Sequence, residues 1–185
     1  IFRFGHAFNI VLMVYTSILK FRVAMKKVLL LIFGFSVVLI AVAYFMEYQM
    51  GLEPCPMCII QRIAIALTGL AALIGYFHDR WFKFYFSLTT MFSIAGAASA
   101  IRHLYLQSLP EDQVPFCGPD LGYLLDNAYF SDALRMLFIG DGNCAEVVWS
   151  LFGISIPGWV LIWCIINICL SVSQLNPKTA LSKSN

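Results

Sequence analysis

Four long stretches of the chain are almost wholly apolar, and polar residues separate each from the next. They cover residues 28–46, 59–77, 84–101 and 156–172. Each holds about 17–20 residues, which at a helical rise of about 1.5 Å per residue matches a hydrocarbon core about 30 Å thick. The third stretch is rich in Ala, Gly and Ser, which permit close packing between helices. The pattern therefore predicts an all-α membrane protein built as a four-transmembrane-helix bundle.

Composition supports this prediction and excludes an ordinary soluble domain. Of the 185 residues, 61% are hydrophobic and 12% are charged, whereas soluble domains have about 25% charged residues. The net charge of +2 is small, and it does not point to a nucleic-acid partner. The expected surroundings are a lipid bilayer.

The distribution of charge predicts the orientation of the bundle. Nine of the ten Asp and Glu residues lie between the first and second stretches or between the third and fourth. The basic residues that flank the stretches on the other side are Lys20, Arg22, Lys26, Lys27, Arg80, Lys83, Lys178 and Lys183. Because cytoplasmic segments carry an excess of Lys and Arg, both termini are expected to be cytoplasmic, with residues 175–185 as a tail. Residues 103–155 then form a long loop on the outer side.

The first 24 residues stand apart from this pattern. The chain starts at Ile1, whereas Met25 is followed by two lysines and the first apolar stretch, as is typical of a natural start. We therefore expect residues 1–24 to be a cytoplasmic N-terminal extension, either upstream sequence or the product of a misplaced start codon. The membrane domain is expected at residues 25–174. Because no small-x-small cleavage site precedes Glu47, its first stretch is expected to be a retained anchor rather than a signal peptide.

A C-x-x-C pair opens the second apolar stretch. Cys55 and Cys58 can close a small disulfide ring, and Pro56 restricts the backbone between them. If Cys58 opens the helix, the unpaired N–H groups and the positive end of the helix dipole favour its thiolate. Arg62 lies four residues later, on the same helix face. A cation inside a membrane span normally faces protein, water or a polar ligand, so a functional role for Arg62 is expected, with snorkelling to the interface as the alternative.

The long outer loop carries a second pair of cysteines. Cys117 follows a proline-rich segment and is expected in an exposed, extended stretch. Residues 121–138 mix apolar and charged positions in a way that suits short helices on the membrane surface. Residues 140–143 read Gly-Asp-Gly-Asn, a turn signal that would let Cys144 move relative to those helices.

Four of the six cysteines fall on the outer side, where disulfides form and persist. A structural disulfide between Cys117 and Cys144 is one reading; it would close a loop of about 28 residues and contribute roughly 3 kcal/mol. A zinc site is a second reading, but the loop pair lacks the short spacing that matches Cys55 and Cys58, so no metal is expected. The two cysteines of the fourth stretch are expected to fill apolar space: Cys164 and Cys169.

Several motifs together resemble the disulfide bond formation protein B (DsbB) family. They are CPMCIIQR at residues 55–62, RHLYLQ at 102–107, LPEDQVPFC at 109–117, GNCAE at 142–146 and IPGW at 156–159. The resemblance runs from about Met25 to Val172 and covers all four apolar stretches. Residues 1–24 fall outside it.

The resemblance implies a multi-pass protein of the bacterial inner membrane with its active cysteines in the periplasm. Such a protein reoxidises the periplasmic dithiol oxidase DsbA and passes the electrons to a membrane quinone. By this resemblance Cys117 forms the mixed disulfide with DsbA, and Cys144 is its partner. Exchange between the loop pair and Cys55 then carries the oxidation inward.

The resemblance also implies a cofactor, ubiquinone or menaquinone. Cys58 would be the thiolate that faces the quinone ring, with Arg62 beside it as the polarising cation. This fits the chemistry, because a thiolate donates electrons and a fixed cation stabilises developing negative charge. His103 matches a histidine of the family near the quinone and would donate to a ring oxygen. The alternative for His103 is an interfacial residue at a helix end.

Three other functions agree with parts of the sequence. A specialised relative of the same family would serve one dedicated partner. A quinone reductase resembling the vitamin K epoxide reductase group also uses a four-helix bundle with C-x-x-C, but there the pair lies near the end of a late helix. A membrane scaffold with structural cysteines would leave Arg62 unexplained.

Overall fold

The computed structural model describes residues 2–110, 113–114, 131, 140 and 142–175. Side chains are described from Thr16 onward, except those of residues 17–18. Two sequence predictions lie outside this description, namely the position of Cys117 and, apart from Ser131, the surface helices of residues 121–138.

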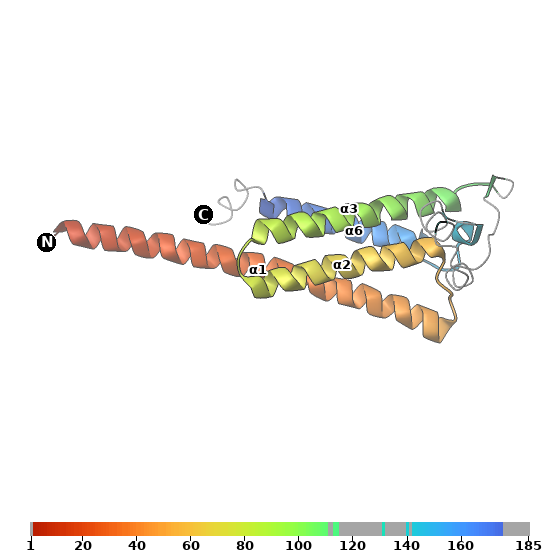
Figure 1. The fold of residues 1–185 in the computed structure, drawn as a ribbon, viewed down its shortest axis with the longest axis horizontal. Coiled ribbons are helices and arrows are strands. Elements are labelled where there is room, and N and C mark those ends of the chain that lie inside the picture. The colour runs from red at the N-terminus through yellow and green to blue at the C-terminus, as the bar shows by residue number, and fades with distance from the viewer. Residues whose placement is uncertain (1, 111–112, 115–130, 132–139, 141, 176–185) are drawn as a thin grey trace.

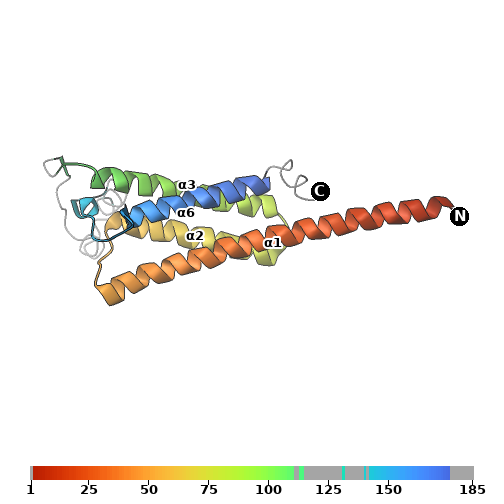
Figure 2. The ribbon, with the colours of Figure 1, turned by 180° about the vertical axis from the view of Figure 1, so that it is seen from behind.

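Four long helices make up most of the described chain. They are α1 (Phe2–Met50), α2 (Pro56–His78), α3 (Phe82–Gln107) and α6 (Ile156–Leu175). Figures 1 and 2 show them side by side, with the N-terminal half of α1 extending past the other three. By length and composition each can cross a membrane. The prediction of a four-helix membrane bundle is confirmed.

The helices extend beyond the apolar stretches that predicted them. Helix α1 begins far before residue 28 because the chain up to Met50 contains no proline, and it ends where Gly51 takes a positive φ of 65°. Helix α3 continues through Gln107, past the predicted end at residue 101. Arg102 and His103 interrupt the apolar pattern, but neither breaks a helix. The outer loop therefore begins after Gln107 and not at residue 103.

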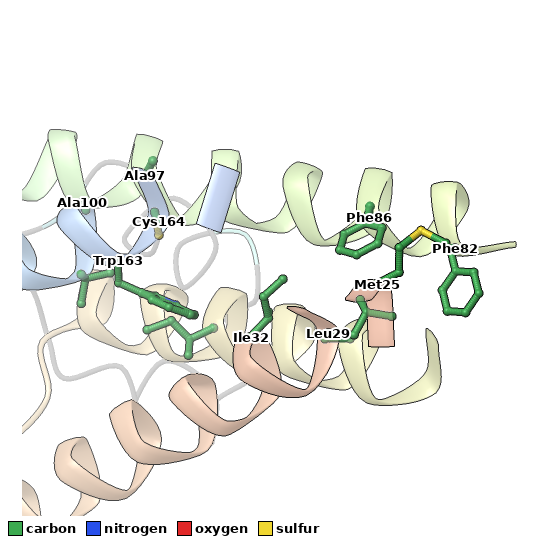
Figure 3. Packing of buried hydrophobic residues seen from close by; sticks show 12 residues of the cluster. Met25, Leu29, Ile32, Phe82, Phe86, Ala97, Ala100, Trp163 and Cys164 are labelled. Carbon is green, nitrogen blue, oxygen red and sulfur yellow. The ribbon is translucent and has the colours of Figure 1, made fainter. Parts of the chain in front are cut away.

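The core lies along the middle of the bundle and draws on every helix. Figure 3 shows Met25, Leu29 and Ile32 of α1 directed toward residues of α3 and α6. The core residues are Met25, Leu29, Ile32, Ile65, Ala72, Phe82, Phe86, Ala97, Ala100, Val160, Trp163 and Cys164. Helix α3 packs against both α2 and α6, whereas α1 packs mainly against α2. This unequal packing leaves one side of α1 open to a cavity near its C-terminal end.

Small and polar side chains bring the helices together. A Cβ atom at Gly96 of α3 would lie 3.1 Å from the Cys164 sulfur, so glycine lets α3 and α6 approach closely. Asn167 donates to the Ser93 hydroxyl at 2.7 Å across the same pair of helices. The prediction that Cys164 fills the core is confirmed. The same prediction for Cys169 is wrong, because its side chain is exposed on the outside of α6.

Two short elements lie between α3 and α6, at the end of the bundle opposite the chain's N-terminus (Figure 1). The 3-10 helix η2 covers Gly142–Ala145. Strands β1 (Ser150–Leu151) and β2 (Ile154–Ser155) form an antiparallel hairpin with Ser150 opposite Ser155. Phe152 and Gly153 turn the hairpin with positive φ angles, and β2 leads directly into α6. Helix η2 packs against α3, and β2 packs against α6.

Candidate functional site

The start of α2 is organised around Cys55. This residue is the N-cap, with an extended backbone, and its sulfur accepts a hydrogen bond from the Cys58 N–H at 3.4 Å. Pro56 occupies the first helical position, where its missing N–H leaves nothing unpaired. The prediction that Cys58 opens the helix is therefore wrong by two residues, because Pro56 opens it. The positive end of the helix dipole lies beside the Cys55 sulfur, and Cys58 lies within the first turn.

The two sulfurs of the C-x-x-C pair lie together. The Cys55 and Cys58 Sγ atoms are 3.0 Å apart, and both residues are free cysteines. A disulfide bond between them needs an approach to about 2.05 Å. A small rotation of either side chain is enough for that, so the pair can close and open without rearranging the helix.

His103 lies inside α3 and is buried, with 3% of its surface exposed. Its Nε2 atom is 3.8 Å from the Cys55 sulfur, and its Nδ1 atom is 3.2 Å from the Gln61 side-chain nitrogen. The reading of His103 as a residue at the water boundary is wrong, because α3 carries it a full turn inside the helix end. Gln61 received no role from the sequence. The signal that could have found it is an amide one turn after Cys58 in an apolar span.

Cys144 is buried in η2, with none of its surface exposed. Its sulfur, the Cys55 sulfur and a ring nitrogen of His103 all lie within 4.8 Å of one another. These three residues come from η2, the start of α2 and the end of α3. The fold therefore brings together one cysteine of the C-x-x-C pair and one cysteine of the outer loop.

A tightly packed glycine holds η2 in this position. Gly140 has a positive φ of 82°, which fits the predicted turn. A Cβ atom there would lie 2.5 Å from Leu106 Cδ1 and 2.9 Å from Met57 Sδ. Leu106 and Met57 also form a small apolar cluster with Cys144. The turn that was expected to let Cys144 move instead packs against the ends of α2 and α3.

Arg62 faces protein rather than lipid. One end of its guanidinium forms an ion pair with the Glu47 carboxylate, and Nη2 donates to the Ala43 carbonyl at 3.2 Å. The group also lies over the Tyr44 ring, 5.4 Å from its centre. All three partners belong to α1, so the cation joins α1 to α2. A charge inside a membrane span is normally paired in this way.

A cavity of about 280 Å³ opens beside the C-x-x-C pair. It lies between α1, α2, α6 and the hairpin, and most of its lining is apolar, including Leu39, Ile65, Trp159 and Val160. The polar side chains that line it belong to Glu53, Cys58, Gln61 and Arg62. Cys58 and Arg62 thus share the helix face that their spacing predicts.

The C-x-x-C pair separates two environments. Cys58 lines the cavity, whereas Cys55 lies on the side of His103 and Cys144. Among the described residues, neither His103 nor Cys144 belongs to the cavity lining. An arrangement of this kind can pass electrons from a buried loop cysteine on one side to a pocket for a small molecule on the other.

The chain is similar to a large group of curated proteins. The family model described as "Disulfide bond formation protein DsbB" matches residues 25–174. Disulfide bond formation protein B of Saccharophagus degradans is 47% identical over 152 residues, which cover 80% of this chain and 92% of that protein. The protein of the same name in Hahella chejuensis is 46% identical over 67% of this chain and 77% of its own length. That of Acinetobacter baumannii is 36% identical over 76% of this chain and 84% of its own.

The family match covers α1 from Met25 onward, all of α2 and α3, and α6 up to residue 174. It includes both cysteines of the C-x-x-C pair, His103 and Cys144. Identity to the Saccharophagus degradans protein is 47% and extends over most of the length of both chains, which agrees with the family match. This chain is a multi-pass membrane protein that belongs to the DsbB family of disulfide bond formation proteins.

Proposed function

We propose that this protein reoxidises a periplasmic dithiol oxidase of the DsbA type and passes the electrons to a membrane quinone. The observation that carries the proposal is the position of Cys55 between two environments. Its own partner Cys58 lines a cavity, and Cys144 of the outer loop lies within 4.8 Å of its sulfur. Thiol–disulfide exchange needs the attacking sulfur to lie close to the attacked one, as these two do.

The first exchange takes place at the loop cysteines. A thiolate of reduced DsbA attacks Cys117 of a Cys117–Cys144 disulfide and releases the Cys144 thiolate. The second DsbA thiolate then attacks the DsbA sulfur of the mixed disulfide, which leaves DsbA oxidised and both loop cysteines reduced. Two electrons and two protons have then moved from DsbA to the loop pair.

The second exchange moves the electrons inward. The Cys144 thiolate attacks Cys55 of the Cys55–Cys58 disulfide and releases Cys58 as a thiolate. Cys117 then attacks Cys144, restores the loop disulfide and leaves Cys55 reduced. The reduced pair now stands at the wall of the cavity, through Cys58.

His103 and Gln61 support the exchange at Cys55. The Gln61 amide nitrogen can only donate, so at 3.2 Å it donates to Nδ1 of His103. The ring proton is then on Nε2, which faces the Cys55 sulfur at 3.8 Å. A donor in this position stabilises negative charge on Cys55 whenever its disulfide opens. These contacts favour a role for His103 at Cys55 rather than at a quinone oxygen.

The cavity fits the head of a quinone, either ubiquinone or menaquinone. Its lining is apolar apart from a few polar groups at one wall, as small-molecule sites usually are. A bound quinone would supply a two-electron, two-proton acceptor beside Cys58. Arg62 would stabilise negative charge at that wall, and its ion pair with Glu47 holds the guanidinium in place until then. Gln61 offers a further polar atom to the same wall.

We also propose that the protein lies in the bacterial inner membrane with both termini in the cytoplasm. The basic residues that flank the spans support this orientation. In this orientation the end of the bundle where Lys26 pairs with Asp79 at 3.1 Å, in the turn between α2 and α3, would be the inner end. The four cysteines of the relay then lie on the periplasmic side.

Anaerobic turnover tests the proposal. Purified protein is mixed with reduced DsbA and a soluble quinone, and the quinone absorbance is followed. We expect consumption of quinone that needs DsbA, is lost in Cys58→Ala and is unchanged in Cys164→Ser, whose cysteine is buried in the core away from the site. No consumption by protein with its outer cysteines oxidised, with either class of quinone, would contradict the proposal.

A further inference from the structure

We propose that the fully reduced protein binds one Zn²⁺ ion through Cys55, Cys144 and His103. The ion would hold the relay in its reduced state. This inference goes beyond the proposed function and requires only reduced cysteines, since neither DsbA nor quinone takes part in binding.

The distances between the three residues fit a zinc site. With bonds of about 2.3 Å to sulfur and about 2.0 Å to nitrogen, neighbouring ligand atoms of a tetrahedral site lie about 3.5–3.8 Å apart. The Cys55 sulfur and His103 Nε2 are 3.8 Å apart. All three ligand atoms lie within 4.8 Å of one another. Shifts of no more than about 1 Å therefore bring them to the spacing of a zinc site.

Cys58 offers the fourth ligand. Its sulfur is 3.0 Å from the Cys55 sulfur, and a turn of its side chain that widens this gap to about 3.8 Å gives the spacing of two thiolates on one zinc ion. Three cysteines and one histidine are a common set of ligands in structural zinc sites. The sequence predicts no metal on the spacing of the loop cysteines alone, because no sequence pattern brings His103 and Cys144 to the C-x-x-C pair.

Gln61 supports the histidine in this role. A histidine that binds zinc through one ring nitrogen usually donates its other N–H to an oxygen nearby. The Gln61 amide already contacts Nδ1 of His103 at 3.2 Å. A rotation of the amide by about 180° presents its oxygen to an Nδ1–H and leaves the Nε2 lone pair for the metal. With one orientation of the amide, Gln61 donates to His103 as the relay requires. With the other orientation, it accepts from His103 as zinc binding requires.

The surroundings are those of a closed site. Cys144 has no exposed surface, and His103 has 3% exposed. The neighbouring cluster of Met57, Leu106 and Cys144 is apolar, so this side of the site is shielded from water. Structural zinc sites are closed in this way, whereas catalytic ones keep a position open.

Binding depends on the redox state. Zinc binds thiolates, so the cysteines release their protons to solvent when the ion binds. A disulfide at Cys55 or Cys144 removes a ligand, so the oxidised protein should not bind. Conversely, a bound ion occupies the sulfur lone pairs that Cys55 and Cys144 need for exchange.

The experiment measures metal directly. The full-length chain in detergent is reduced, freed of reductant without oxygen and dialysed against Zn²⁺, and the metal retained per chain is determined. Co²⁺ is used in parallel, because tetrahedral thiolate ligation gives it intense visible and charge-transfer bands. We expect one ion per reduced chain, none per oxidised chain, and the tetrahedral Co²⁺ spectrum.

Variants separate a built site from adventitious binding. Cys144→Ser and His103→Ala should each lower the affinity by at least tenfold, and Gln61→Leu by about 10–100-fold. Cys164→Ser and Cys169→Ser should bind as the wild type does, since both cysteines lie on α6 away from the site. Absence of binding to the reduced wild type would overturn the proposal. So would binding that survives in both Cys144→Ser and His103→Ala, because the result would then be an adventitious ion only.

Discussion

Replacing Gly140 with alanine should loosen the contact between the loop cysteine Cys144 and the C-x-x-C pair. Two costs apply at this position. An L-residue at a φ of +82° is strained, and the left-handed backbone costs about 1–2 kcal/mol. The added Cβ would also meet Leu106 Cδ1 at 2.5 Å and Met57 Sδ at 2.9 Å.

The second cost cannot be avoided by a simple side-chain rotation. Leu106 and Met57 are each only 1% exposed, so neither has open space to enter. Overpacking of this kind costs about 1–3 kcal/mol. The free energy of unfolding should therefore fall by about 2–5 kcal/mol in total, unless the outer loop moves away from α2 and α3. Such a movement would carry Cys144 with it.

Gly153 provides the matched control. It has a similar φ of +78°, but nothing lies within 4 Å of its Cβ position. Gly153→Ala should therefore show the backbone strain alone, about 1–2 kcal/mol. The two variants are compared by thermal unfolding in detergent and by the rate at which Cys144 is alkylated in the folded, reduced protein. Alkylation should be faster in Gly140→Ala and unchanged in Gly153→Ala. Equal stability and equal alkylation rates of Cys144 in the two variants would show that the close packing of Gly140 does not hold η2 in place.

Three further changes probe other parts of the molecule. Arg62→Ala should leave the loop disulfide intact but slow quinone reduction by at least tenfold and raise the apparent KM for quinone. The control is Arg102→Ala, on an exposed face of α3. Wild-type kinetics in Arg62→Ala would show that the cation takes no part in the mechanism. Cys117→Ser should abolish oxidation of DsbA while the C-x-x-C pair still forms its disulfide with quinone, so normal DsbA turnover would show that another cysteine receives the electrons. Asn167→Leu removes the 2.7 Å hydrogen bond to Ser93 and should lower the free energy of unfolding in detergent by about 0.6–1.7 kcal/mol; no loss would mean that the buried amide does not hold α3 to α6.

The membrane helices could be predicted because a lipid-spanning helix depends on a local feature of the sequence, an unbroken apolar run. Their ends could not be predicted in the same way. Arg102 and His103 end the apolar run of α3, yet the helix continues to Gln107 because a polar residue does not break backbone hydrogen bonds. The apolar stretch of α2 begins at residue 59, but the helix begins three residues earlier, at Pro56. Pro56 is a strong signal for a first helical position, and it moves the N-cap to Cys55.

In the candidate site, relations within one helix could be predicted, whereas contacts between helices could not. The relation of Cys58 to Arg62 depends on helical spacing, so it could be predicted, and both side chains line one cavity. The contact of Cys55 with His103 and Cys144 depends on how α2, α3 and η2 pack, and no local pattern encodes it. Gln61 was missed because its partner is a histidine on another helix.

The central claim is that electrons reach the C-x-x-C pair through direct exchange between Cys144 and Cys55. The most direct test is disulfide mapping. Oxidised wild-type protein is mixed anaerobically with reduced DsbA, quenched with acid at successive times, alkylated and analysed by peptide mass spectrometry. We expect a transient Cys55–Cys144 disulfide that rises after the DsbA–Cys117 link and decays as Cys117 restores the loop disulfide and leaves Cys55 and Cys58 reduced. Turnover in which only Cys117–Cys144 and Cys55–Cys58 links are found at every time would contradict it.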